Sequence, residues 1–171
     1  MVEFIPDDSG DLTVPFFEDA NNALGVVGYT TSLSETKLQS KIKQAMADLG
    51  GVVTGFQSGM FGERHAYRID FIYQGSAGRM DIACLPLKKE TDARRRQTRR
   101  HALFSVWKRL EGLFNSMLVS PGDVPLVPYM IDDKGLTMIE WMRDEGRLPA
   151  LPKPKDDGDT VDGEFREAED D

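Results

Sequence analysis

Apolar residues recur at helical spacing in the segment that follows Ser32. They fall on one face of a helix and comprise Leu38, Ile42, Ala45, Met46 and Leu49. Ser32 and Glu35 have the spacing of a capping box, and Gly50 with Gly51 ends the run. The pattern therefore predicts a helix over about residues 32–49, whose outer face carries Lys37, Lys41 and Lys43.

Three strand-like runs follow, at residues 52–57, 64–73 and 78–85. In the second run apolar and polar residues alternate with a period of two, so one face is apolar and the other is charged. A hairpin that turns at residues 74–77 would place Ile69 opposite Ile82 and Asp70 opposite Asp81. The sequence thus predicts a three-stranded antiparallel sheet with one apolar face.

A long helix is predicted for residues 90–119. Its apolar stripe, which we expect to pack on the sheet, consists of Leu103, Val106, Trp107, Leu110, Leu113, Phe114 and Met117. The opposite, polar face consists of Arg94, Thr98, His101, Ser105 and Arg109. Beyond it we expect a short strand at residues 126–131 and a short helix with Thr137 and Glu140 as its capping box.

These elements predict the α+β class, with the order helix, three-stranded antiparallel sheet, long helix, short strand and short helix. We expect one core domain at residues 32–148, because about 120 residues of this composition can bury a core of their own. Residues 1–31 form an acidic N-terminal arm, for which Phe16 and Phe17 leave docking on the core, docking on a partner or an irregular edge as open alternatives. Residues 149–171 form a Pro-rich linker and a disordered acidic tail.

Charge is sorted along the chain in the same blocks. Residues 1–35 contain seven acidic residues and no Lys or Arg, and residues 156–171 contain nine acidic residues and only Arg166. The formal net charge of −8 therefore conceals a basic core. A basic core between acidic ends favours a polyanionic partner whose access the ends can modulate.

The strongest candidate site is a run of arginines at the start of the long helix. Arg95, Arg96, Arg99 and Arg100 share the helix sector that the apolar stripe occupies further along, so we expect this end of the helix to overhang the sheet and expose them. Guanidinium groups match phosphate oxygens. We therefore predict a phosphate-binding surface to which Arg68, Lys88 and Lys89 add, with Met60 or Phe61 meeting the bases. A solvated charge run that is paired with nearby acids is the alternative interpretation.

Asp70 and Asp81 form a second candidate, because like charges that lie opposite each other in a hairpin need compensation. Arg68 and Arg79 can neutralise them as an ion-pair ladder, or a divalent metal can bind between them. With Glu35 on the preceding helix, this layout resembles the PD-(D/E)xK nuclease superfamily. The resemblance implies cleavage dependent on Mg²⁺ by Asp70, Asp81 and Glu35. Ala83 stands where the family motif has lysine, which leaves Lys88 as the candidate for that role.

The order of helix, three strands and helix over residues 32–119 also resembles two other families. These are the double-stranded RNA-binding domains, in which a basic cluster opens the last helix as Lys88 and Lys89 do here, and the phage-type single-strand-annealing proteins. Both resemblances imply nucleic-acid binding without catalysis.

We therefore expect a nucleic-acid-binding protein, without a cofactor or a resident metal, that binds or anneals single-stranded DNA in recombination, repair or a mobile element. The alternatives are a Mg²⁺-dependent nuclease and a protein–protein adaptor that binds an acidic partner. Self-association and a protein partner for the acidic tail are further expectations. The lone Cys84, the acidic start of the chain and the lack of about 18 consecutive apolar residues favour a cytoplasmic protein with no membrane contact.

Overall fold

The computed structural model describes residues 14–20, 31–120 and 122–147. Residues 1–13 and 21–30 of the predicted arm lie outside this range, as do residues 148–171, which include the predicted linker and acidic tail. The expectations for the tail therefore remain sequence predictions.

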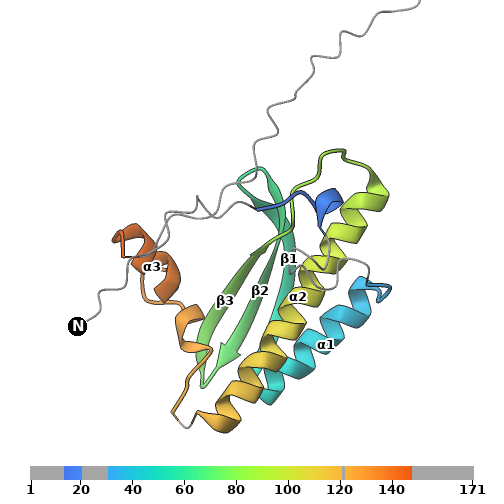
Figure 1. Cartoon of the computed structure of the whole chain (residues 1–171). Coiled ribbons are helices and arrows are strands. Elements are labelled where there is room, and N and C mark those ends of the chain that lie inside the picture. The colour runs from blue at the N-terminus through green and yellow to red at the C-terminus, as the bar shows by residue number, and fades with distance from the viewer. Residues whose placement is uncertain (1–13, 21–30, 121, 148–171) are drawn as a thin grey trace, which may run out of the picture.

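The described residues form a three-stranded antiparallel sheet in the order β1-β2-β3, with two long helices on one face (Figure 1). The strands are β1 (Gly51–Phe61), β2 (Arg64–Tyr73) and β3 (Ser76–Ala83), and the helices are α1 (Glu35–Asp48), α2 (Asp92–Val119) and α3 (Met138–Asp144). Short 3-10 turns lie at η1 (Phe17–Asp19) and η3 (Val127–Tyr129). The predicted α+β class is confirmed. No helix in the described ranges is long and apolar enough to cross a lipid bilayer.

Helix α1 begins two residues later than the predicted capping box implies. Its N-cap is Ser34, whose hydroxyl accepts a hydrogen bond from the backbone N–H of Lys37. Glu35 makes no capping contact with Ser32, because its carboxylate accepts a hydrogen bond from the Tyr67 hydroxyl at 2.5 Å. A tertiary contact therefore replaces the local one.

The register of the second hairpin differs from the prediction by two residues. The turn consists of Gln74 and Gly75 alone, both with positive φ (49° and 78°), and Tyr73 pairs directly with Ser76. Such a two-residue turn matches the twist of the flanking strands. As a result Asp70 lies opposite Arg79, and Asp81 lies opposite Arg68. The predicted juxtaposition of Asp70 with Asp81 is therefore wrong.

This register also places Phe71 opposite Gly78. The ring of Phe71 covers the glycine so closely that a Cβ atom there would lie 2.3 Å from the ring. An aromatic ring on the neighbouring strand that covers a glycine supplies the packing that the glycine, which has no side chain, cannot supply itself. The pairing therefore favours this register over the predicted one, which places Met80 opposite Phe71.

The core lies between the sheet and the two long helices. The apolar stripes of α1 and α2 pack on the inner sheet face, where Ile69, Phe71 and Met80 are buried. The predicted polar face of α2 is only partly exposed, because Thr98 and His101 are buried. The Thr98 hydroxyl donates to the Leu85 carbonyl at 3.0 Å, and the His101 ring lies 6.2 Å from the ring of Phe17 in the arm. The arm and the connection between β3 and α2 therefore cover this side of the helix.

The predicted strand at residues 126–131 is instead the 3-10 turn η3, flanked by isolated β-bridges at Met130 and Ile131. Pro128 lies within the turn and has no N–H to donate to a ladder. The predicted capping box of α3 is confirmed, since the Thr137 hydroxyl accepts from the Glu140 N–H and the Glu140 carboxylate accepts from the Thr137 N–H. This C-terminal unit packs beside β3 (Figure 1).

Candidate nucleic-acid interface

Helices α1 and α2 run side by side with their N-termini toward the same end of the molecule (Figure 1). Lys41 lies on the side of α1 that faces α2, because its Nζ contacts the Trp107 ring, and Lys37 lies one helical turn before it on the same face. Arg96 and Arg100 are one turn apart in the sector of α2 that also contains Trp107. We call these four residues the interhelical face. They place four positive charges along the line where the two helices meet.

Aromatic side chains of α2 hold Lys41 in place. The Lys41 Nζ lies 4.4 Å from the centre of the Trp107 ring, and the Lys108 Nζ lies 4.0 Å from it. Phe104 packs edge-on against Trp107, with the ring centres 5.4 Å apart. Contacts between an ammonium group and an aromatic ring are attractive. They therefore hold Lys41 beside the seam between the helices without neutralising its charge.

The interhelical face has no acidic counterpart within the described part of the chain. None of its four cations forms an ion pair with a described carboxylate, although six other described Lys or Arg residues do. The Nε atom of Arg100 is enclosed and has no hydrogen-bond partner among the described residues. The charge of this surface is thus available to an external anion.

The structure places the four predicted arginines in three different surroundings. Arg96 and Arg100 belong to the interhelical face, whereas Arg95 donates to Glu90 at 2.9 Å and lies 3.6 Å from Asp92. The hydrogen bond from Arg95 lowers the pKa of Glu90. Arg99 is partly buried and lies near Cys84: burial raises the pKa of the Cys84 thiol to about 11, and the Arg99 guanidinium acts against that rise. The alternative interpretation as a paired charge run therefore describes Arg95.

The N-terminal arm docks on the connection between β3 and α2. The Glu18 carboxylate accepts hydrogen bonds from the backbone N–H groups of Lys88 and Lys89, at 3.1 and 3.3 Å, and lies 3.5 Å from the Arg94 guanidinium. Asp19 forms an ion pair of 2.9 Å with Lys88. For residues 14–20, the docked alternative is thus the one observed, and it places acids against the predicted phosphate-binding residues Lys88 and Lys89.

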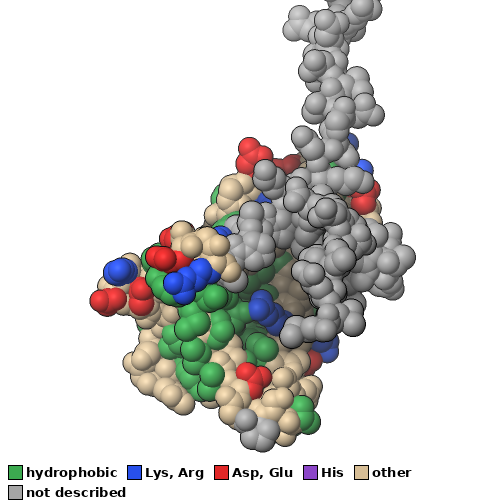
Figure 2. Space-filling model, turned by 60° about the vertical axis from the view of Figure 1, so that its left-hand side comes forward, with side chains coloured by type: hydrophobic (Ala, Val, Ile, Leu, Met, Phe, Trp, Pro, Cys, Tyr) green, Lys and Arg blue, Asp and Glu red, His purple; other side chains and the backbone are tan. Residues whose placement is uncertain are grey.

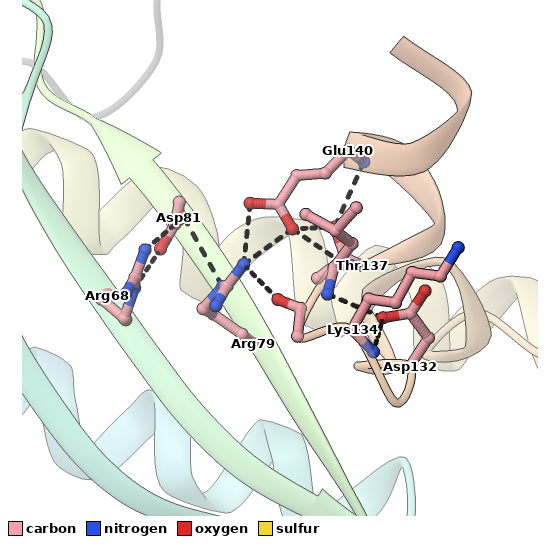
Figure 3. A network of polar contacts seen from close by, with 9 residues as sticks. Arg68, Arg79, Asp81, Asp132, Lys134, Thr137 and Glu140 are labelled. Atoms are coloured by element: carbon pink, nitrogen blue, oxygen red, sulfur yellow. Dashed lines mark hydrogen bonds and ion pairs between the residues drawn. The ribbon is translucent and has the colours of Figure 1, made fainter. Parts of the chain in front are cut away.

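The sheet face opposite the helices carries a different arrangement of charges (Figure 3). Arg68 donates two hydrogen bonds to Asp81, at 2.7 and 2.9 Å, and Arg79 donates two to Glu140, at 2.8 and 2.7 Å. Figure 2 shows acidic and basic side chains next to one another on this side of the molecule, beside a band of apolar side chains. Arg68, although predicted to bind phosphate, is therefore paired and lies on the opposite side of the sheet from the interhelical face.

The residues of the nuclease alternative do not come together. Asp70 and Asp81 lie on the outer face of the sheet, where Asp70 accepts from Gln57 and Asp81 is held by Arg68. Glu35 lies on the inner, helix-covered side, bonded to Tyr67. Lys88 is at the arm contact. No cluster of three or more metal-ligating His, Cys, Asp or Glu residues occurs in the described ranges.

The tip of the β1–β2 hairpin presents the predicted base-contacting residues to solvent. Met60 is 57% exposed and Phe61 is 40% exposed. The hairpin tip lies at the same end of the molecule as the start of α2 (Figure 1). Behind it, Phe61, Gln57 and Ala66 line a shallow depression of about 220 Å³ on the outer sheet face.

Two features of the site are absent from the sequence prediction: the contribution of Lys37 and Lys41, and the role of Glu18 at the arm contact. The spacing of four residues in both Lys37/Lys41 and Arg96/Arg100 was a usable signal, because each pair must share one helix face. Comparisons with known protein families, with curated proteins and with solved structures find no match for this chain.

Proposed function

We propose that this protein binds single-stranded nucleic acid on the interhelical face and performs no chemistry on it. The observation that carries the proposal is the contrast in pairing: Lys37, Lys41, Arg96 and Arg100 have no acidic partner among the described residues, while the cations of the outer sheet face do. Unpaired cations grouped on one surface are the electrostatic requirement for a phosphate backbone.

The side chains around this face favour a single strand. Arg96 and Arg100 lie about 6 Å apart along the helix axis. Their planar guanidinium groups can donate hydrogen bonds to phosphate oxygens. Phe104 and Trp107 provide a partly exposed aromatic surface beside them. Unpaired bases stack on such side chains, whereas bases inside a duplex are already stacked. Binding of this kind, without catalysis, fits a role in DNA recombination, repair or a mobile element.

The direct test is the double variant Arg96→Ala with Arg100→Ala. Loss of two phosphate contacts should weaken binding of a labelled oligonucleotide by on the order of 10- to 30-fold at 0.1 M salt, equally for all sequences, and lower the salt slope by about 1.4. Fluorescence anisotropy at several salt concentrations measures both quantities. The matched control is Lys134→Ala with Arg147→Ala, which changes the net charge equally on the α3 side and should alter affinity less than about threefold.

The same titration with single- and double-stranded DNA and RNA, with and without Mg²⁺, separates the competing functions. Tighter binding of duplex than of single strand would contradict the strand preference. Cleavage that requires Mg²⁺ and is lost in Asp81→Asn would contradict binding without chemistry. Equal affinity of the double variant and its control would remove the interhelical face from the interface.

A further inference from the structure

We propose that the connection between β3 and α2 is a phosphate site that the arm residue Glu18 occupies in the free protein, and that a nucleic-acid phosphate takes its place on binding. The proposal rests on the proposed function for the identity of the ligand. The anion site itself rests on the contacts of Glu18 alone.

Glu18 is held as a bound anion is held. Consecutive backbone N–H groups, those of Lys88 and Lys89, each donate to one oxygen of its carboxylate, at 3.1 and 3.3 Å. The Arg94 guanidinium lies 3.5 Å away, and the Glu18 side chain is only 14% exposed. Successive backbone N–H groups that converge on one anion form the kind of concavity that binds phosphate in many proteins. The carboxylate therefore stands in for a phosphate group.

The rest of the arm is attached in a way that permits exchange. The Phe17 N–H donates to the Pro86 carbonyl at 2.8 Å, and the buried Phe17 side chain packs beside His101. These contacts involve the backbone and an apolar ring, so they do not depend on the carboxylates. Phe17 can thus keep the arm near the site while Glu18 leaves it, which gives the arm a high local concentration as a competitor.

The position of the site fits one continuous path for a strand. Arg94 contacts Glu18 on one side of α2, and Arg96 lies in the first turns of the same helix, about 160° away around its axis. A strand that passes around the N-terminal end of α2 can therefore place one phosphate at the arm site and others, further along the strand, on the interhelical face. Displacement of Glu18 would then add one phosphate contact to those of the interhelical face.

Glu18→Gln tests this exchange, because it removes the competing charge and retains the size of the side chain. Oligonucleotide affinity should rise by about fivefold at 0.1 M salt, because the phosphate no longer has to displace a carboxylate, and the salt slope should stay close to that of the wild type, because the number of phosphate contacts in the complex is the same. Asp133→Asn is the matched control: it makes the same change in net charge at an exposed turn, away from both helices. Asp19→Asn is a second variant that leaves the Glu18 hydrogen bonds in place, and it should give a smaller increase.

A second measurement does not involve nucleic acid. Titration of Glu18→Gln with inorganic phosphate should shift the backbone amide resonances of Lys88 and Lys89, at lower phosphate concentrations than in the wild-type protein. If these amides shift but no variant binds oligonucleotides, the anion site stands and the proposed function fails. If they do not shift, or if Glu18→Gln and Asp133→Asn bind oligonucleotide equally, the phosphate site is disproved.

Discussion

The outer face of the sheet and the interhelical face both carry several charged side chains, but only on the outer face are the basic side chains paired with acidic ones. On the outer face, Arg68 and Arg79 are hydrogen-bonded to Asp81 and Glu140, and Glu140 also caps α3 (Figure 3). On the interhelical face, Arg96 and Arg100 have no acidic partner within the described residues.

The difference indicates two uses of the same side chain. Arg79 is largely enclosed, with 16% of its side chain exposed, and its pairing with Glu140 attaches α3 to the sheet. An enclosed guanidinium needs its carboxylate, because a buried charge without a partner is strongly destabilising. The cations of the interhelical face have no carboxylate partner among the described residues, so their charge remains available to a ligand. The contact of the N-terminal arm lies between these two cases, because its basic residues are paired, but with acids of the arm and not of the core domain.

The largest effect should follow from removal of Glu140. We expect Glu140→Ala to lower the free energy of unfolding by about 2–3 kcal/mol, because Arg79 loses its carboxylate and α3 loses its capping box. Urea denaturation measures this change. By contrast, Arg96→Ala with Arg100→Ala should change stability by less than about 0.5 kcal/mol. An equally large loss in that variant would mean that its arginines are structural and would remove the distinction between the two faces.

A change of pH should produce a smaller effect through Glu140 on the outer face. Partial burial acts to raise the pKa of Glu140, but the hydrogen bonds from Thr137 and Arg79 together hold that pKa below its ordinary value. A lowered pKa stabilises the fold at pH values above the unfolded-state pKa, and this stabilisation is lost as the pH falls through the folded-state pKa. Glu140→Gln should therefore be less stable than wild type by about 1 kcal/mol at neutral pH.

This difference should narrow as the pH falls below about 4.5, because the protonated wild-type side chain then resembles glutamine. Thermal unfolding of both proteins over a series of pH values tests it. The stability difference between wild type and Arg96→Ala with Arg100→Ala should stay constant over the same range. A Glu140→Gln difference that does not narrow would show that the carboxylate charge does not contribute.

The smallest effect is expected for Arg68→Ala. Its pair with Asp81 is partly exposed, with 44% of the Arg68 side chain accessible, and such pairs contribute at most about 1 kcal/mol. Oligonucleotide affinity should stay within about twofold of wild type, because Arg68 lies on the outer face. A loss of affinity comparable to that of the Arg96 and Arg100 variant would show that nucleic acid contacts the outer face as well.

The sequence by itself determined the elements. The helical spacing of Leu38 and Ile42, the alternation in β2 and the Thr137 capping box each involve residues a few positions apart, and all three appear in the structure. Local spacing of this kind is dictated by backbone geometry. Such spacing did not decide whether the N-terminal arm docks, because Phe16 and Phe17 were compatible with docking and with an irregular edge.

Only the tertiary structure decided which charges are paired. The register of the second hairpin depended on positive φ at Gln74 and on space for the Phe71 ring over Gly78, and a shift of two residues separated Asp70 from Asp81. The partners of Arg79 and of the Lys88 backbone, Glu140 and Glu18, are 61 and 70 residues away in sequence. Periodicity places a charged side chain on a face of its own element, but a contact across such a distance depends on how the elements pack together.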